Sequence, residues 1–296
     1  METIILNSRW DKRELHGLMH TPEDAPCAVI QIVHGMAEHK ERYIPFMEYL
    51  ATRGIASVIF DTRGHGESIL SEDELGYMEG GWNALCDDLL LISAYVKEQF
   101  PEIPYTLMGH SMGSLEVRRF AQAHDDRIDR LIVCGSPSSN PAAGIGVLLA
   151  KLIALFKGKK HPSRFLDRMA FSGYGENFTW LSTNEESNEV YRADPLCGFL
   201  FTAGGFETLF KLMRDVYSPT YWDVKHRDLP VLFIAGEKDP CIVSPKKFGN
   251  AISFMRDMGY RSMKAILYPE MRHEVLNEID RATVYQDVAD FILAEK

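Results

Sequence analysis

Cysteine is scarce in this 296-residue chain, and its pattern excludes the usual structural uses of that residue. The number of cysteines is odd and none are spaced C-x-x-C, so we expect neither a disulfide framework nor a cysteine-based zinc site: Cys27, Cys86, Cys134, Cys197 and Cys241. Positive charge is in deficit as well. Thirty-two Lys and Arg against 42 Asp and Glu give a net charge of −10, so we expect no nucleic-acid partner.

Long apolar runs are also missing. The longest, Ala142–Phe156, is interrupted by Lys151 and is shorter than the roughly 20 residues needed to cross a bilayer. Near the N-terminus, the charged residues between Arg9 and Glu14 precede any apolar core of a secretion signal. We therefore expect a cytoplasmic protein, with peripheral membrane contact through the central apolar run as a hypothesis.

Short runs typical of β-strands alternate with longer helical patterns through most of the chain, which predicts an α/β fold with a mostly parallel, doubly wound sheet. The strands are expected at Thr3–Leu6, Glu14–Met19, Ala28–Val33, Ala56–Phe60, Tyr105–Met108, Leu131–Cys134, Val231–Ala235 and Lys264–Leu267, the last six as buried strands. Helical periodicity predicts helices at Tyr43–Arg53, Trp82–Phe100, Ser114–Ala123, Pro245–Met258 and Ala282–Ala294.

This alternation stops for about ninety residues before the strand Val231–Ala235, where helical and loop-like patterns occur without a convincing strand. We interpret residues 137–228 as a helical cap inserted into an α/β core formed by residues 1–136 and 229–296. The cap contains the apolar run Ala142–Phe156, which we expect to form a helix lining the entrance to the site. Leu148 and Leu152 are the substrate-binding residues that this interpretation predicts.

The pentapeptide Gly109-His-Ser-Met-Gly113 follows one predicted strand directly and precedes a predicted helix. This is the strand–turn–helix setting in which G-x-S-x-G presents an exposed nucleophilic serine. A capping serine in an ordinary turn is the alternative. We predict that Ser111 is the nucleophile of an acyl-transfer reaction.

A serine hydroxyl needs a base and a carboxylate that orients that base. Asp239 follows the strand Val231–Ala235, and His273 follows Lys264–Leu267, so both lie on loops at the sheet edge that presents Ser111. We predict that they complete a Ser-Asp-His triad, with Glu237 and His226 as the nearest competing acid and base. His110 neighbours Ser111 in sequence, points away from it, and is expected to pack.

Donors for the developing oxyanion are expected from two backbone N–H groups. Met112 directly follows the nucleophile, and Met36 lies in the loop after the strand Ala28–Val33. The glycines of Asp61–Gly66 are expected to serve turns and not phosphate binding. His16 and His20 lie in a strand, where their spacing is unsuited to a zinc site.

The combination of motifs resembles the monoglyceride lipase and lysophospholipase branch of the α/β-hydrolases. The matching segments are His34-Gly-Met-Ala-Glu-His39 with Arg42-Tyr43, Asp61-Thr-Arg-Gly-His-Gly-Glu-Ser68, Gly109–Gly113, Tyr191-Arg-Ala-Asp-Pro-Leu196 and the Asp239 and His273 loops. Ser114 departs from a frequent third glycine, and residues 142–160 do not match. The resemblance implies the same triad and oxyanion donors, and no cofactor or metal.

We therefore expect a serine carboxylester hydrolase that forms an acyl-enzyme on monoacylglycerols, lysophospholipids or similar small lipid esters. A thioesterase, an amidase or an aminopeptidase of the same fold is the alternative within this chemistry. A non-catalytic binding protein that keeps the fold is the alternative from another class. The sequence leaves acyl length, leaving alcohol and oligomeric state open.

Overall fold

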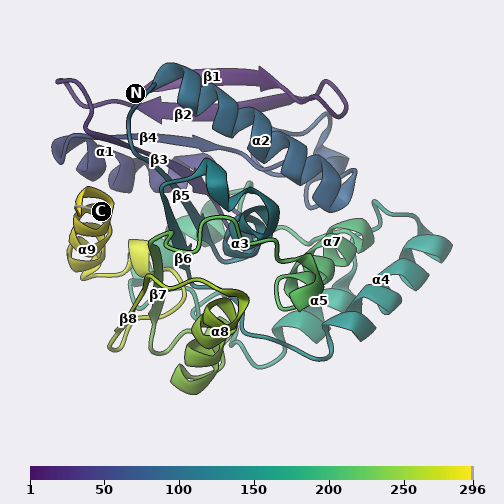
Figure 1. The fold of residues 1–296 in the computed structure, drawn as a ribbon. Helices are drawn as coiled ribbons and strands as arrows, with labels where there is room; N and C mark the ends of the chain where they lie inside the picture. The colour runs from purple at the N-terminus through teal and green to yellow at the C-terminus, as the bar shows by residue number, and fades with distance from the viewer. Residues whose placement is uncertain (295–296) are drawn as a thin grey trace.

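The computed structural model describes residues 1–294, and one eight-stranded sheet forms its centre (Figure 1). The strands are β1 (Glu2–Asn7), β2 (Glu14–His20), β3 (Ala28–Val33), β4 (Ile55–Phe60), β5 (Tyr105–His110), β6 (Arg130–Cys134), β7 (Val231–Gly236) and β8 (Met263–Tyr268). In space they follow the order β1-β2-β4-β3-β5-β6-β7-β8. β2 pairs antiparallel with β1 and β4, and the remaining pairs are parallel. The predicted mostly parallel sheet is confirmed.

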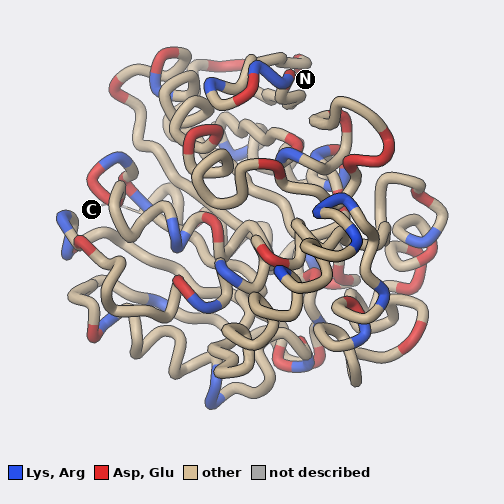
Figure 2. Tube along the Cα trace, turned by 90° about the vertical axis from the view of Figure 1, so that its right-hand side faces the viewer, with Lys and Arg blue, Asp and Glu red and all other residues tan. Residues whose placement is uncertain are grey.

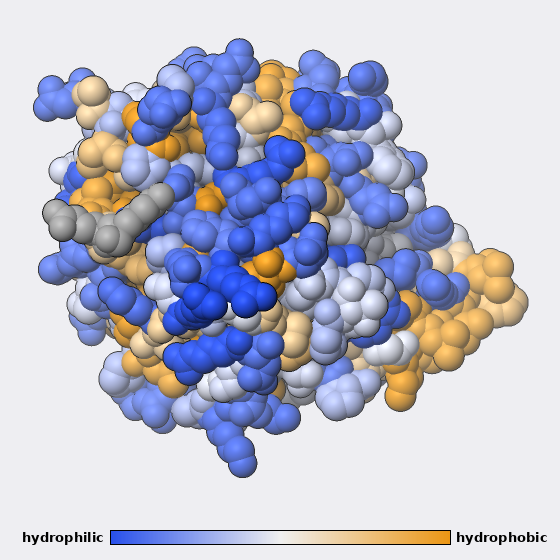
Figure 3. Space-filling model, viewed as in Figure 1, coloured by the Kyte–Doolittle hydropathy of each residue, from blue (hydrophilic) through white to orange (hydrophobic). Residues whose placement is uncertain are grey.

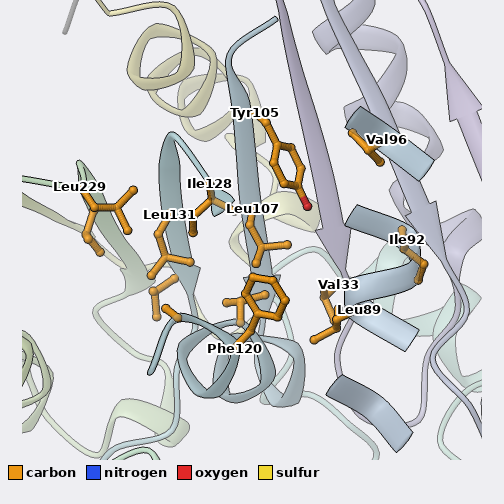
Figure 4. Close-up of a cluster of buried hydrophobic side chains, with 14 of the residues drawn as sticks. Val33, Leu89, Ile92, Val96, Tyr105, Leu107, Phe120, Ile128, Leu131 and Leu229 are labelled. Carbon is orange, nitrogen blue, oxygen red and sulfur yellow. The ribbon is translucent and has the colours of Figure 1, made fainter. Parts of the chain in front are cut away.

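Helices cover both faces of this sheet, because the central strands are apolar on both sides. One face carries α1 (Ile44–Thr52) and α9 (Arg281–Leu293), which pack with Ile30, Ile59 and Ile132. The other carries α2 (Gly81–Gln99), α3 (Met112–His124) and α8 (Pro245–Met258). Figure 4 shows part of that second layer, in which Phe120 of α3 approaches Leu107 of β5 and Leu89 of α2 approaches Val33 of β3.

The expectation of a buried strand at Lys264–Leu267 is wrong. β8 spans Met263–Tyr268 and lies at the edge of the sheet, so Lys264 and Ala265 are exposed. An edge strand has a neighbour on one side only, and a lysine is a common way to protect it. The helix predicted from Ser114 begins two residues earlier, at Met112, because the strand turns into the helix at a single residue, Ser111.

The segment between β6 and β7 adds four helices and, among the described residues, no strand of the sheet. These are α4 (Ala143–Lys157), α5 (Arg164–Phe171), α6 (Glu185–Ala193) and α7 (Ala203–Asp215). α4 packs on α7 at one side of the molecule (Figure 1). In Figure 2, which faces that side, acidic and basic residues are interspersed. No described helix is both long and apolar enough to cross a membrane.

Six 3-10 turns complete the described chain and lie in its loops: η1 (Lys40–Tyr43), η2 (Glu72–Glu74), η3 (Asp125–Arg127), η4 (Pro219–Tyr221), η5 (Pro240–Ile242) and η6 (Val275–Asn277). Two of them are important for the site. η1 follows the loop after β3, and η5 begins directly after Asp239. Both therefore lie where the parallel strands end.

Candidate active site

Ser111 occupies a strained turn between β5 and α3. Its φ of 52° and ψ of −115° are outside the regions that L-residues normally adopt. The flanking glycines permit this close turn: a Cβ on Gly109 would lie 2.2 Å from the Gly113 carbonyl oxygen. A Cβ on Gly113 would lie 2.2 Å from the carbonyl oxygen of Val33 in β3. Local strain and packing therefore hold the Ser111 side chain at the sheet edge, where it lines a cavity.

His273 and Asp239 come together at the same edge. The His273 Nδ1 lies 3.0 Å from both carboxylate oxygens of Asp239, and both side chains are buried. Asp239 also accepts a hydrogen bond from the Cys241 N–H at 2.8 Å. With Nδ1–H donated to the carboxylate, the Nε2 of His273 is left as a base, 3.9 Å from the Cys241 sulfur.

The competing residues lie elsewhere. Glu237 is exposed, and its backbone N–H bonds the carbonyl of Tyr268. His226 is in the loop before β7, where its backbone N–H bonds Asp125. Asp239, and not Glu237, is thus the carboxylate that contacts His273.

The loop after β3 holds its shape through buried hydrogen bonds. The Gly35 N–H donates to Glu38 Oε1 at 2.5 Å, and His34 accepts from the Thr62 N–H at 2.9 Å through Nε2. Burial lowers the pKa of His34, so the neutral ring donates its Nδ1–H to the Gly35 carbonyl, 2.8 Å away. Met36 of this loop and Met112 both line the cavity beside Ser111. No hydrogen-bond partner is found among the described residues for either methionine N–H.

A buried charge cluster beneath the cavity was not expected from the sequence. Arg42 binds Glu38 at 2.6 Å and makes two 2.6 Å contacts to Glu274, the residue after His273. Burial alone raises the pKa of Glu38, but the hydrogen bond from His110 and the charge of Arg42 outweigh it and hold that pKa well below its usual range. His110 also lies 3.3 Å from the carbonyl of His273 through its Nε2. His110 thus joins this cluster, and its ring lies 4.8 Å from that of His273, centroid to centroid.

The cavity has a volume of about 750 Å³ and is enclosed by the sheet edge and the segment 137–228. Ser111, His273, Met36 and Met112 all line it. The apolar side chains that line it from α4 and α7 are Ile145, Leu209, Phe210 and Met213. From the segment between α5 and α6 come the aromatic residues Tyr174, Phe178 and Trp180, which no motif in the sequence indicates.

The expectation that Leu148 and Leu152 line the entrance is not met. They are 58% and 44% exposed on the outer face of α4 and are not among the residues that line the cavity. α4 turns its small residues toward α7 instead: a Cβ on Gly146 would lie 2.8 Å from the Phe210 ring. Because the small residues allow this close approach, the larger leucines face outward.

Two groups of side chains meet the geometric requirements of a metal ligand set within the described residues. One consists of Asp239, Cys241 and His273, where the carboxylate is already bonded to the imidazole. The other consists of His39, Asp194 and Cys197, where His39 lies between Glu41 and Asp194 at 2.5 and 2.8 Å. In this second group burial lowers the pKa of His39, but its hydrogen bonds to Cys197, Glu41 and Asp194 raise it to about 11 overall. A protonated imidazole between two carboxylates is an ion pair and not a metal ligand.

Comparison with known proteins identifies the family to which the chain belongs. The family model described as "Serine aminopeptidase, S33" matches residues 24–280. Monoacylglycerol lipase of Mycolicibacterium smegmatis is 24% identical over 93% of this chain and 91% of its own length. Phospholipase YtpA of Bacillus subtilis is 24% identical over 90% of this chain and 96% of its own length.

Among solved structures, a thermostable carboxyl esterase from Bacillus coagulans superimposes with a TM-score of 0.87 at 23% identity, over 98% of this chain and 97% of that one. Monoacylglycerol lipase of Paleococcus ferrophilus superimposes with a TM-score of 0.73 at 21% identity, over 94% of this chain and 98% of that one. These likenesses show the α/β-hydrolase fold. The chain is thus a hydrolase that belongs to the serine aminopeptidase S33 family, in the monoglyceride lipase-like branch of the α/β-hydrolases.

Proposed function

We propose that the protein is a serine carboxylester hydrolase that acts on monoacylglycerols or lysophospholipids through an acyl-enzyme. The observation that carries the proposal is that the buried Asp239–His273 pair and a serine on a strained turn meet at one large cavity, which Ser111 and His273 both line. Lipid ester hydrolases among the relatives of the chain support the substrate class.

These positions support a mechanism with one acyl-enzyme intermediate. His273 Nε2 takes the proton of Ser111 Oγ as that oxygen attacks the ester carbonyl, and the N–H groups of Met36 and Met112 stabilise the oxyanion. The C–O bond to the alcohol then breaks, and the imidazolium gives its proton to the leaving oxygen. Water, deprotonated by the same nitrogen, hydrolyses the acyl-enzyme. Asp239 holds the imidazole in the tautomer that leaves Nε2 free.

The acyl chain is assigned to the apolar part of the cavity lined by Ile145, Leu209, Phe210 and Met213. Each buried methylene contributes about 0.8 kcal/mol, so kcat/KM should rise about fourfold per methylene until the cavity is full. An acyl series of p-nitrophenyl esters measures this rise directly.

The test of the triad uses three variants and a fluorophosphonate probe. S111A and D239N should each lose activity by about 10⁴-fold, because the nucleophile or the correct tautomer is missing. E237Q is the matched control and should stay near wild type. Retention of more than a tenth of the activity by S111A would reject the assignment, and equal labelling of S111A and wild type would reject Ser111 as the nucleophile.

Parallel assays with acyl-thioesters and amino-acid anilides distinguish the alternative substrates. Of the carboxylates around His273, Asp239 is bonded to its imidazole, and Glu38 and Glu274 are both paired with Arg42. They are therefore poor partners for the free ammonium group of a peptide substrate. A higher kcat/KM for the anilides than for monoacylglycerols would make the protein a peptidase.

We also propose that the outer face of α4 contacts the lipid surface from which such substrates come. Leu155 and Phe156 are 75% and 82% exposed, and Figure 3 shows the hydrophobic projection that α4 forms at the edge of the molecule. Exposed Lys151, Lys157 and Lys159 flank this face and suit anionic headgroups. Lys160 is engaged with Asp73 and Glu74.

This contact is tested by sedimentation with vesicles that contain phosphatidylglycerol. The double variant L155S/F156S should bind these vesicles at least about tenfold more weakly, since two apolar side chains no longer leave water. V190S alters an apolar residue of α6 that is 61% exposed and serves as the control. Equal binding of wild type and the double variant would refute the contact.

A further inference from the structure

The end of α5 and the segment that follows it bring three aromatic rings to the part of the cavity that holds the candidate catalytic histidine. The ring of Trp180 lies 5.0 Å from that of His273, centroid to centroid, and 5.2 Å from that of Tyr174. Phe171, the last residue of α5, stacks on Trp180 at 6.1 Å. All three side chains are half-buried and line the cavity, so they present surface to whatever occupies it.

A polar group accompanies these rings. Tyr174 and Cys241 both line the cavity, and the Cys241 sulfur is 3.9 Å from His273 Nε2. Tyr174 therefore brings a hydroxyl group to the same cavity as His273, with its ring 5.2 Å from that of Trp180. Neither Tyr174 nor Trp180 has a part in the mechanism described above.

The residues that line the cavity belong to two packing clusters, and Phe171 packs against the first and stacks on Trp180 of the second. Leu209 and Phe210 belong to the same apolar cluster as Met112, with Met36 packed against it, on the side of the predicted oxyanion donors. Trp180 and Phe178 pack against a separate small cluster of Leu181, Tyr191 and Cys197. The part of the cavity at the first cluster adjoins the oxyanion side of Ser111, and the part at the second adjoins His273.

Ester hydrolysis assigns different pieces of the substrate to these two parts. The leaving oxygen receives its proton from His273 Nε2, so it must lie within hydrogen-bond reach of that nitrogen, about 3 Å. The alcohol attached to that oxygen then lies against whatever surrounds the imidazole. Here the surroundings are the Trp180 ring and the Tyr174 hydroxyl.

We propose that Tyr174 and Trp180 form the subsite for the leaving alcohol and select a neutral polyol of glycerol's class. This inference rests on the proposed function. The indole ring offers a flat face to C–H groups, and the phenol offers a hydrogen bond to a second hydroxyl. The nearby carboxylates Glu38 and Glu274 are both paired with Arg42, and Glu38 also lies 3.2 Å from His110. Because these partners already occupy them, an uncharged alcohol is favoured over a cationic one.

The first experiment compares two esters that share one acyl group and therefore one acyl-enzyme. Acylation and deacylation are measured separately for glyceryl monodecanoate and methyl decanoate, since methanol is too small to fill the subsite. W180A and Y174F should each slow acylation by the glyceryl ester about three- to tenfold, the loss of one stacking contact or one hydrogen bond. Acylation by the methyl ester and deacylation should stay near wild type, and W180F should restore most of the loss from W180A.

The second experiment measures the reverse step, in which the acyl-enzyme transfers its acyl group to an alcohol bound in the same subsite. Glycerol added as an acceptor competes with water for the acyl-enzyme, and the ratio of monodecanoylglycerol to decanoic acid reports alcohol binding alone. Y174F and W180A should lower this ratio about three- to tenfold. I145A alters the opposite, acyl-binding part and should shift the chain-length optimum while leaving the ratio unchanged.

Each outcome has one meaning. If W180A slows the glyceryl and methyl esters by the same factor and leaves the partition ratio unchanged, Trp180 only positions His273 and the subsite is refuted. If S111A keeps its activity, the proposed function itself fails, whatever Trp180 does. Circular dichroism and Tm of each variant identify any that are misfolded, in which case the conservative pair W180F and Y174F decides.

Discussion

Removal of Arg42 should expose how strongly the protein depends on its buried charge cluster. Arg42 is nearly enclosed and lies between Glu38 and Glu274, which are 3% and 4% exposed. R42A leaves two buried carboxylates without their cation. Breaking one buried pair typically costs about 3–5 kcal/mol, so we expect a loss of at least that size in the free energy of unfolding and a fall in Tm of roughly 10 °C.

The pH dependence of this loss has a defined sign. In the wild type the pKa of Glu38 and of Glu274 is lowered, so their contribution to stability is present above the ordinary carboxyl pKa of 4.5 and is lost as the pH falls below it. In R42A burial is no longer balanced by the cation and both pKa values rise. The difference in stability between wild type and R42A should therefore be largest near pH 8 and shrink toward pH 5.

The assay is urea unfolding at pH 5, 6.5 and 8, followed by circular dichroism. R42K keeps the charge but loses the two-pronged contact to Glu274, and should fall between wild type and R42A. R53A is the matched control, because Arg53 makes a half-exposed pair with Asp290 and should cost below about 1 kcal/mol. A loss below 1 kcal/mol in R42A, or one that is the same at pH 5 and pH 8, would refute the reasoning.

Two further predictions follow from buried ionisable groups. Cys241 is 7% exposed, and burial together with the charge of Asp239 raises the pKa of its thiol well above the usual value. N-ethylmaleimide should therefore label exposed Cys27 first, without loss of activity, and then inactivate the protein slowly through Cys241, which lies beside His273 and lines the cavity. C241S should abolish this slow inactivation. An equal rate of inactivation in C241S and wild type would reject the prediction. Glu116 of α3 is 1% exposed with an unpartnered Oε1, and burial followed by the charge of Asp88 raises its pKa to about 8. A carboxyl group with a raised pKa in the folded state contributes stability at low pH that is lost as the pH rises toward 8. Between pH 5 and 8, E116Q should therefore gain more than about 1 kcal/mol in stability relative to wild type. Urea titrations that give the same difference in stability at these pH values would contradict this.

The local features of the candidate site were readable from the sequence because they depend on neighbours in the chain. Gly109 and Gly113 flank Ser111, and a turn this tight has no room for a Cβ at either position. Asp239 and His273 each follow a strand, and parallel strands of one sheet end at the same edge. Strand order along the chain was therefore enough to predict that Asp239 and His273 would meet.

The orientation of α4 was decided by packing and could not be read from its apolar pattern. Apolar residues occur around most of the helix, so periodicity does not say which stripe faces inward. Gly146, Val147 and Ala150 face α7 because small side chains let the two helices approach closely, and Leu148 and Leu152 are left outside. Ile145 consequently lines the cavity in their place.

By itself, the sequence determined the sheet, the strained serine turn and the loops that carry Asp239 and His273, since each depends on periodicity or on strand order. Only the tertiary structure decided which distant side chains meet. Arg42 and Glu274 are 232 residues apart and pair because the loops after β3 and β8 converge. Trp180 reaches His273 because the segment after α5 folds back over the sheet edge. No local pattern records such a contact, because its energy arises from burial that exists only once the whole chain is folded.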